Sequence, residues 1–382
     1  MRLGVYCDYS YRLDDGELYA ELPFGLFAQE LAPHCERLVF VGRLDPTPGR
    51  FPFRMRGAGF VPLPAYTSGA HLREVLVAIP ASARRFWRAL DDLDTVWILG
   101  PNPPQALLFA MLALIRRRRL VLGVRQNLPE LIRHRHPHRP LVRSAASGLE
   151  AAWRALALLV PIVVVGPDLA RHYRHARSVA VTYVSLLSER DITPPEQDRR
   201  RYDGPELRIL SVGRLDAEKN PLLLARVLAL AVRADPRWQL HICGEGTETE
   251  ALLDEFDRLG VSGHATLHGY VPIDDGLWDH YRDSHVLLHV SLTEGVPQVL
   301  LEAFAARLPV VATAVGGVPA LVEGCGLLVG VDDATAAADA LGRLASDGKL
   351  RSRYVEAAAQ RIREHTLGAE CARLAAFLSG RR

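Results

Sequence analysis

Short apolar segments alternate with helical patterns along almost the whole chain. Most of these segments are β-branched, lack polar alternation and end in glycine or proline, which is typical of strands buried on both faces of a parallel sheet. One series lies at residues 3–7, 38–42, 59–63, 95–100, 120–124, 161–166 and 179–184, and a second at residues 207–213, 239–244, 265–269, 285–291, 309–313 and 326–330. The pattern predicts two doubly wound α/β domains in tandem, with a cleft between them.

The stretch between the two series carries the signals of a linker. It contains Pro194-Pro195, a charge run and Gly204-Pro205. The chain of 382 residues is long enough for two separate cores. The predicted organisation is an N-terminal domain at residues 1–187, a linker at 188–206, a C-terminal domain at 207–365 and a terminal helix at 366–382, with packing back on the first domain as one option for that helix.

One strand, turn and helix segment of the second series places two carboxylates in an unusual position. Pro297 suits the first helical position, so the helix is expected to begin near Val296 and to have Arg307 in its last turn. Apolar residues surround Glu302 on all sides of this helix, so its carboxylate is expected to be buried and to need donors from the fold or from a ligand. Glu294 lies at the carboxyl end of the preceding strand, where ligands bind in open parallel sheets and helix N–H groups can hold an anion.

Charge is distributed unevenly. Residues 1–185 carry 24 arginines and no lysine against 15 acidic residues, a net charge of +9, whereas the remainder carries −7. This asymmetry favours an anionic partner for the first half or, with about equal weight, an ordinary solvated surface. Five scattered cysteines without a CxxC pair argue against a disulfide framework, and no apolar run reaches the about 20 residues of a membrane span.

Lysine is rare, which draws attention to one loop. Lys219 is one of two lysines among 46 basic residues. It follows Arg214, which lies at the carboxyl end of a predicted strand. The planar fork of arginine and the point charge of lysine together suit a diphosphate. The alternative is that Arg214 pairs with Asp216 or Glu218 on the surface.

The motifs of the second half occur in a characteristic order. They are Gly213-Arg214-Leu215 with Lys219, Gly244-Glu245-Gly246, His268-Gly269-Tyr270-Val271, Glu294 to Glu302 as E-x7-E, and Gly316-Gly317-Val318-Pro319. Over about residues 207–330 this order and spacing resemble the retaining glycosyltransferases of family 4. The resemblance implies the GT-B fold, with two tandem Rossmann-like doubly wound domains and an inter-domain cleft.

The same resemblance implies a site for a nucleotide-diphosphate-sugar. Arg214, Lys219 and Glu294 would be the catalytic residues, with the two cations on the diphosphate and Glu294 on the transferred sugar. Glu302 would accept hydrogen bonds from the ribose. The full implied donor-binding set is Gly213, Arg214, Lys219, Tyr270, Val271, Glu294, Gly295, Val296, Pro297, Gln298, Val299, Leu300 and Glu302.

The implied reaction is transfer of a sugar to an unidentified acceptor, a glycan, a lipid-linked molecule or a small molecule, with retention of anomeric configuration. It needs no cofactor and no metal, and the donor is expected to be UDP- or GDP-linked. The motif Asp92-Leu93-Asp94 precedes a predicted strand and is interpreted as a helix end rather than a metal site. The incomplete G-x-G-x-x-G at Gly244 to Thr249 argues against a nicotinamide-dependent oxidoreductase. The remaining alternative is a non-catalytic module that binds a nucleotide-sugar.

The first half departs from the family pattern. The segment from Asp8 to Glu17 has a single glycine where the family has a glycine-rich turn, so the acceptor and any catalytic group of this half stay open. Arg125, Gln126 and Asn127 lie at a strand end and are acceptor-side candidates, with ordinary loop polar groups as the alternative. Expected partners are the donor and an acceptor, with peripheral contact to an anionic membrane surface as an option and no nucleic acid. The expected location is cytoplasmic, with the inner membrane face as an option.

Overall fold

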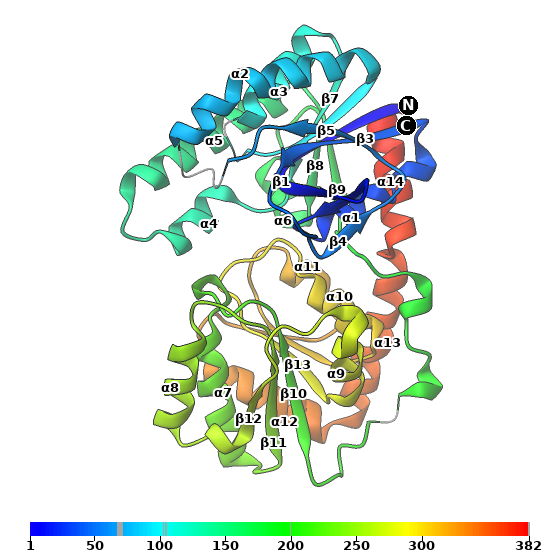
Figure 1. The fold of residues 1–382 in the computed structure, drawn as a ribbon. Helices are drawn as coiled ribbons and strands as arrows, with labels where there is room; N and C mark the ends of the chain where they lie inside the picture. The colour runs from blue at the N-terminus through cyan, green and yellow to red at the C-terminus, as the bar shows by residue number, and fades with distance from the viewer. Residues whose placement is uncertain (67–71, 102, 104, 199, 381–382) are drawn as a thin grey trace. The chain divides into compact units, whose positions relative to one another are not determined.

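A computed structural model describes residues 1–66, 72–101, 103, 105–198 and 200–380 (Figure 1). By their contacts these residues divide into two units. Unit 1 comprises the chain up to Leu186 together with the segment from Leu367, and unit 2 comprises Leu187–Thr366. Arg199 of the predicted linker and Arg381 and Arg382 of the predicted terminal helix lie outside the described residues.

Unit 1 is built on one mixed sheet. Hydrogen bonding joins its described strands in the order β4-β2-β1-β6-β7-β8-β9, with β3 beside β1 and β5 beside β3. All pairs are parallel except β1 with β2 and β2 with β4. The strands are β1 (Arg2–Asp14), β2 (Glu17–Ala20), β3 (Arg37–Leu44), β4 (Phe53–Met55), β5 (Gly59–Leu63), β6 (Thr95–Leu99), β7 (Arg119–Val124), β8 (Ile162–Val165) and β9 (Val179–Thr182).

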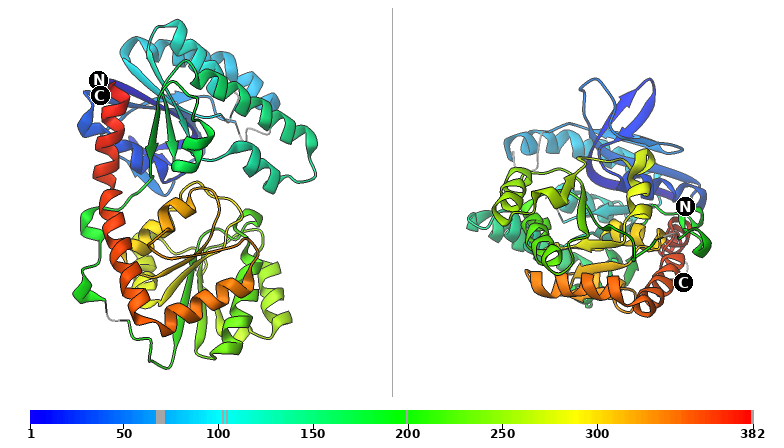
Figure 2. Two further views of the ribbon diagram at one scale, coloured as in Figure 1. Left: turned by 180° about the vertical axis from the view of Figure 1, so that it is seen from behind. Right: turned by 90° about the horizontal axis from the view of Figure 1, so that it is seen from below.

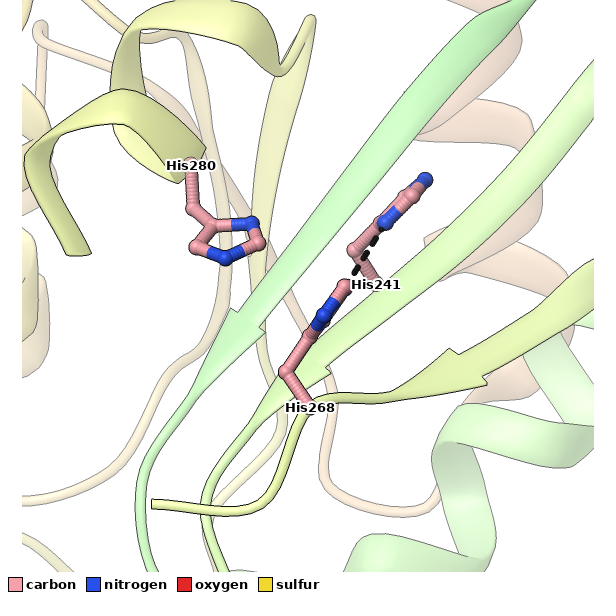
Figure 3. Close-up of side chains that lie close together, drawn as sticks. All are labelled: His241, His268 and His280. Carbon is pink, nitrogen blue, oxygen red and sulfur yellow. Dashed lines mark hydrogen bonds between the residues drawn. The ribbon is translucent and has the colours of Figure 1, made fainter. Parts of the chain in front are cut away.

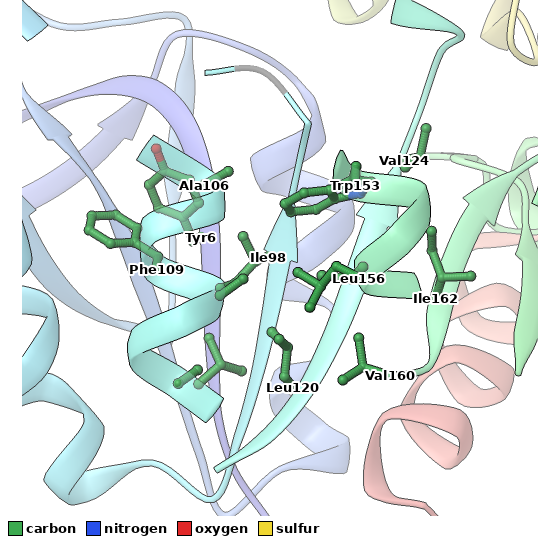
Figure 4. Packing of buried hydrophobic residues seen from close by; sticks show 14 of the residues in the cluster. Tyr6, Ile98, Ala106, Phe109, Leu120, Val124, Trp153, Leu156, Val160 and Ile162 are labelled. Carbon is green, nitrogen blue, oxygen red and sulfur yellow. The ribbon is translucent and has the colours of Figure 1, made fainter. Parts of the chain in front are cut away.

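Helices cover this sheet and close its core. The longest are α2 (Leu72–Ala89), α5 (Pro140–Ala157) and α14 (Leu367–Ser379), and the others are α1 (Phe24–Gln29), α3 (Gln105–Ile115), α4 (Leu128–Arg135) and α6 (Pro167–His172). Figure 4 shows Phe109 and Trp153 packed with strand residues such as Ile98 and Leu120, all of them buried. Helix α14 lies with this unit, beside α1, β6 and β9, as Figure 2 shows from behind.

The first strand is longer than the sequence predicts. We expected it to end at Cys7, but β1 continues to Asp14 and turns back into β2. The turn is made by Asp15 and Gly16, whose φ angles of 50° and 77° suit the two central positions of a hairpin turn. Tyr9 and Tyr11 are buried between half-buried polar neighbours. This alternation is that of a strand buried on one face, which a search for continuous apolar runs misses.

Unit 2 is a fully parallel doubly wound sheet. The strand order is β12-β11-β10-β13-β14-β15. The strands are β10 (Leu207–Val212), β11 (Trp238–Cys243), β12 (Ala265–Leu267), β13 (Val286–His289), β14 (Val310–Thr313) and β15 (Leu327–Val329). The helices are α7 (Pro221–Ala234), α8 (Thr249–Leu259), α9 (Trp278–Asp283), α10 (Gln298–Ala305), α11 (Val318–Val322), α12 (Ala334–Ser346) and α13 (Gly348–Glu364). The predicted α/β class, with two Rossmann-like sheets, is confirmed.

The segment predicted as a linker packs on unit 2 where the structure describes it. The side chain of Arg200 is 6% exposed and donates to the carbonyls of Tyr281 and Ser284, and to those of Ala306 and Arg307 after α10. Arg307 itself has a left-handed φ of 58° and pairs with Glu356. The expected place of Arg307 in the last helical turn is therefore wrong, and Arg200 is the cation that satisfies the final carbonyls.

Candidate functional site

The loop from β13 to α10 builds the centre of the candidate site. Helix α10 begins at Gln298, and Pro297 is its N-cap with a ψ of 129°. The expected start near Val296 is thus two residues early, because Pro297 occupies the extended position before the first turn. Gln298 and Val299 are partly exposed, whereas the rest of the helix up to Ala305 is buried.

Glu294 lies at the carboxyl end of β13 and is almost completely enclosed. Its Oε1 accepts from Lys219 Nζ at 2.5 Å and from Ser291 Oγ at 2.7 Å, and it lies 3.2 Å from His289 Nε2. Burial by itself would raise the pKa of this carboxyl, but His289 and Lys219 together outweigh burial and lower it to about 2. Glu294 is therefore an ionised carboxylate held by two nitrogen-bearing side chains.

His289 is a member of this cluster that the sequence did not reveal. It is the last residue of β13, and its side chain is 8% exposed. In the sequence it stands in an otherwise apolar run, which predicts a strand and no separate role for a single polar residue. Its position five residues before Glu294, at a strand end, is the signal that could have identified it.

A glycine pair holds the Glu294 backbone in place. The N–H of Gly317 donates to the carbonyl of Gly295 at 2.9 Å. A Cβ on Gly316 would lie 1.9 Å from the carbonyl oxygen of Glu294, and Gly316 has a left-handed φ of 49°. The loop after β14 thus approaches the loop after β13 as closely as only glycine allows.

Glu302 is buried as the sequence predicts, and its donor comes from the fold. Tyr281 Oη of α9 donates to Glu302 Oε2 at 2.6 Å, and Tyr281 is completely buried. Burial raises the pKa of the Glu302 carboxyl, and the tyrosine hydrogen bond lowers it only in part. Sequence reasoning missed Tyr281, because no spacing links α9 to α10.

Arg214 and Lys219 follow β10, the strand beside β13. The guanidinium of Arg214 pairs with Asp216 and, at 2.8 Å, with Glu218 Oε1. These are the ion pairs that the alternative interpretation of Arg214 predicted. Its side chain is still 55% exposed. Lys219 instead reaches Glu294, so the structure brings together this pair of the predicted catalytic residues.

The remaining predicted donor-site residues lie around the carboxyl ends of the same strands. Gly213 follows β10 with a φ of 147°, and a Cβ on Gly244 after β11 would lie 1.8 Å from the Gly213 carbonyl oxygen. Tyr270 follows β12, is 65% exposed, and its N–H donates to Glu245 Oε1 at 3.2 Å. Val271 is half-buried. These residues share one edge of the sheet, and none of the hydrogen bonds or ion pairs of Glu294 among the described residues involves them.

Unit 1 has a polar cavity of its own, beside the middle of β1 and at the carboxyl ends of β6 and β7. The cavity measures about 330 Å³, and Arg125 and Gln126 are among its lining residues. The guanidinium of Arg125 lies 5.1 Å from the ring centroid of Tyr9 and 5.3 Å from that of Phe24. Asn127 has a structural role instead, because its side chain caps α4 by accepting from the N–H of Glu130.

A largely buried carboxylate faces this cavity. The hydroxyl of Tyr66 donates a hydrogen bond to Asp8 Oδ1, and the same oxygen lies 3.2 Å from Arg43 Nε. Burial raises the pKa of the Asp8 carboxyl despite the opposing charge of Arg43. The unexpected length of β1 places Asp8 here, so no sequence pattern indicates its role.

The fold and the site now allow comparison with known proteins. Residues 195–361 match the family model for glycosyl transferases group 1. The fold is the GT-B fold of solved glycosyltransferase structures, which confirms the predicted fold class.

Individual proteins are similar over different parts of the chain. A D-inositol 3-phosphate glycosyltransferase of Corynebacterium jeikeium is 38% identical over 201 residues, which cover 48% of each chain. HepE of Anabaena, solved in complex with UDP, has a TM-score of 0.72 at 16% identity, and sucrose-phosphate synthase of Thermosynechococcus elongatus has 0.74 at 17%, each over 100% of both chains. The chain spans about half the length of the curated relatives it matches.

The helices in the described part of the chain were compared with the requirements of a membrane span. None of them has both the length and the hydropathy needed to cross a bilayer.

Proposed function

We propose that the chain is a glycosyltransferase that moves a sugar from a nucleotide-diphosphate-sugar to an acceptor hydroxyl, with retention of configuration and without a metal. The observation that carries this proposal is the Lys219–Glu294 pair at the carboxyl ends of adjacent parallel strands, inside the segment that matches the family model. Such strand ends are where open α/β sheets bind ligands. The relatives that the chain resembles are named as glycosyltransferases, which supports the same assignment.

In this proposal the bond between the sugar and the diphosphate breaks, and the acceptor oxygen takes its place on the anomeric carbon. Negative charge grows on the departing phosphate oxygen. Lys219, Arg214 and the N–H groups of Val299 and Leu300 would stabilise that charge, because fixed cations and dipoles act most strongly where charge develops in the transition state. The leaving phosphate would take up the proton of the acceptor hydroxyl, which balances the reaction.

Glu294 would hold the donor sugar. Its pKa of about 2 keeps it ionised at neutral pH, so it accepts hydrogen bonds from sugar hydroxyls and has no proton to give. The backbone from Gly295 to Gln298 would contact the same sugar. The contact of Glu294 with Lys219 aligns the sugar-binding and phosphate-binding groups before the donor arrives.

Glu302 would bind the ribose of the donor. Tyr281 occupies its Oε2, so Oε1 is the oxygen left to accept from a ribose hydroxyl. Tyr270 and Val271 would lie against the base. We expect a UDP- or GDP-linked donor, and the HepE structures with UDP and with UDP-glucose favour UDP as the first to try.

The acceptor would use unit 1. Arg125 and Gln126 line its polar cavity, whose arginines suit an acceptor that carries hydroxyl or anionic groups. A lipid-linked acceptor would explain exposed apolar side chains on arginine-rich helices of this unit: Leu76 and Val77 of α2 are 64% and 81% exposed, and Leu141 of α5 is 85% exposed. Peripheral binding to an anionic bilayer would then bring enzyme and acceptor together.

The first experiment identifies the donor. A thermal-shift screen of UDP-, GDP-, ADP- and dTDP-sugars should give one nucleotide that raises Tm, because a ligand that binds only the folded state stabilises it. The second follows release of the nucleoside diphosphate. Glu294→Gln and Lys219→Ala should lower the rate by about 100-fold or more, whereas Lys349→Ala, which changes the other lysine, exposed on α13, should leave the rate unchanged.

The outcomes separate the two functions considered for this fold. Donor binding without any release, across a broad acceptor panel, would indicate a non-catalytic nucleotide-sugar-binding module. Full activity of either site variant would refute the site assignment. For the membrane contact, co-flotation with phosphatidylglycerol vesicles but not with phosphatidylcholine vesicles is expected, and it should be lost in Val77→Glu.

A further inference from the structure

Three histidines from separate elements meet in unit 2. His241 belongs to β11, His268 directly follows β12, and His280 belongs to α9. Figure 3 shows the three imidazoles next to one another, with His268 between the other two. The rings of His241 and His268 are stacked with centroids 5.3 Å apart, and the centroids of His268 and His280 are 4.3 Å apart. The spacing of these histidines in the sequence does not predict the cluster, because its members are 27 and 12 positions apart.

The nitrogens of the three rings are arranged as a set of metal ligands would be. One ring nitrogen of each histidine lies within 4.8 Å of the others. His241 Nδ1 and His268 Nε2 are 3.0 Å apart and share a hydrogen bond, which a bound ion would replace. A tetrahedral zinc ion with Zn–N bonds of about 2.0–2.1 Å holds its nitrogens about 3.4 Å apart, so modest rotation of the His280 side chain completes the set. All three side chains are half-buried, which leaves a path for an ion.

A carboxylate stands behind one of the rings. Glu206 Oε1 lies 3.9 Å from His241 Nε2, the nitrogen that points away from His268. Metal-binding histidines commonly present their other ring nitrogen to a carboxylate, which fixes the tautomer and strengthens the ligand. The nearby cation Arg208 is already paired with Glu206 at 2.5 Å, so its charge is partly neutralised.

A neutral imidazole has a free lone pair, whereas a protonated one cannot bind a metal. Imidazole nitrogen is a ligand of intermediate softness that suits zinc, copper, nickel and cobalt rather than magnesium or calcium.

We propose that His241, His268 and His280 form a binding site for one divalent transition-metal ion of the zinc class. The ion links the ends of β11 and β12 to helix α9. The residue after His280 is Tyr281, whose hydroxyl holds Glu302, and the residues after His268 lead to Tyr270. The metal is therefore a brace for this edge of unit 2 and takes no part in sugar transfer. The proposal does not depend on the proposed function, because it concerns the histidines alone.

The test measures metal binding directly. The full chain is prepared without a polyhistidine tag, stripped with a chelator, and titrated with Zn²⁺ against a chromogenic zinc indicator. One equivalent should bind, and Co²⁺ should give the visible absorption of a low-coordinate nitrogen site. His280→Gln and His268→Gln should each weaken Zn²⁺ binding by more than 10-fold, because loss of a mere outer partner already costs about 10–100-fold.

Two further variants separate ligand loss from misfolding. His34→Gln changes an exposed histidine of unit 1 and should bind Zn²⁺ like the parent protein. Glu206→Gln keeps all three ligands and should bind more weakly than the parent, but more tightly than His280→Gln. Without metal, His280→Gln should have the same circular dichroism spectrum as the parent, and Zn²⁺ should raise the Tm of the parent only. Absence of a tight 1:1 complex, or unchanged binding in His280→Gln, would overturn the proposal.

Discussion

Tyr281→Phe isolates the hydrogen bond that opposes the rise in the pKa of the buried Glu302 carboxyl. The substitution removes only the hydroxyl that donates to Glu302 Oε2 at 2.6 Å and keeps the buried ring. A hydrogen bond to an ionised carboxylate contributes about 1.5–3 kcal/mol to the free energy of unfolding. For a unit of the size of Leu187–Thr366, we expect Tm to fall by about 3–12 °C at a pH at which Glu302 is ionised.

The loss of stability in Tyr281→Phe should depend on pH. The folded pKa of Glu302 is raised above its unfolded value, so unit 2 loses stability as pH rises from the unfolded value of 4.5 through the folded pKa. Tyr281 opposes that rise, and its removal raises the folded pKa further. The Tm difference between Tyr281→Phe and the parent should therefore be larger at pH 8 than at the lowest pH at which the protein stays folded.

Two controls identify the cause. Tyr202→Phe also removes a tyrosine hydroxyl of unit 2, but this one donates to the neutral carbonyl of His285 at 2.7 Å. Tyr202→Phe should lower the free energy of unfolding by only about 0.5–1.5 kcal/mol. In the Glu302→Gln background, where no charge remains, Tyr281→Phe should cost no more than that. The reasoning is refuted if both tyrosine variants lose the same stability at pH 8, or if the Glu302→Gln background leaves the loss unchanged.

Further predictions concern the packing and titration of the same regions. Gly316→Ala should lower the free energy of unfolding by about 1–3 kcal/mol and weaken donor binding in a thermal-shift assay, because its Cβ would meet the Glu294 carbonyl. Gly342→Ala in α12, with open space around it, should instead raise the free energy of unfolding by about 0.5–1 kcal/mol. The lowered pKa of Glu294 gives stability that is present above 4.5 and lost as pH falls toward about 2, so acid unfolding of Glu294→Gln should be less steep. Asp8→Asn should lower the Tm of unit 1 by leaving Arg43 without its buried partner, at a cost of up to about 3 kcal/mol.

Strand positions in unit 2 could be predicted from the sequence because parallel strands buried on both faces appear as unbroken apolar runs. The same rule failed for β1, whose second half is buried on one face only, so its tyrosines alternate with polar residues up to Asp14. The start of α10 was misplaced for a related reason. Proline is favoured at the first helical residue, but the ψ of 129° makes Pro297 the N-cap here, and the sequence does not reveal that angle.

Side-chain partners depend on tertiary distances that no single-sequence pattern contains. The sequence could predict that Glu302 is buried and requires a donor, since apolar neighbours surround it on its own helix. It could not predict that the donor is Tyr281, because the two helices are joined only by folding. The same limit applies to His289, which the sequence places at a strand end but not beside Glu294.

Lys219 and Arg214 both follow β10, but they have different partners. Lys219 stood out because lysine is rare in this chain, and it contacts Glu294. Arg214 shares its loop but is bridged to Asp216 and Glu218. If Arg214 serves the donor diphosphate, the phosphate oxygens must displace those carboxylates, and two like-charged groups then remain close to an anionic ligand. Asp216→Asn should therefore tighten nucleoside diphosphate binding, most strongly at low salt, where exposed charges are least screened. Isothermal titration with UDP in low and high salt measures this, and an unchanged affinity in both would show that Arg214 stays with its carboxylates.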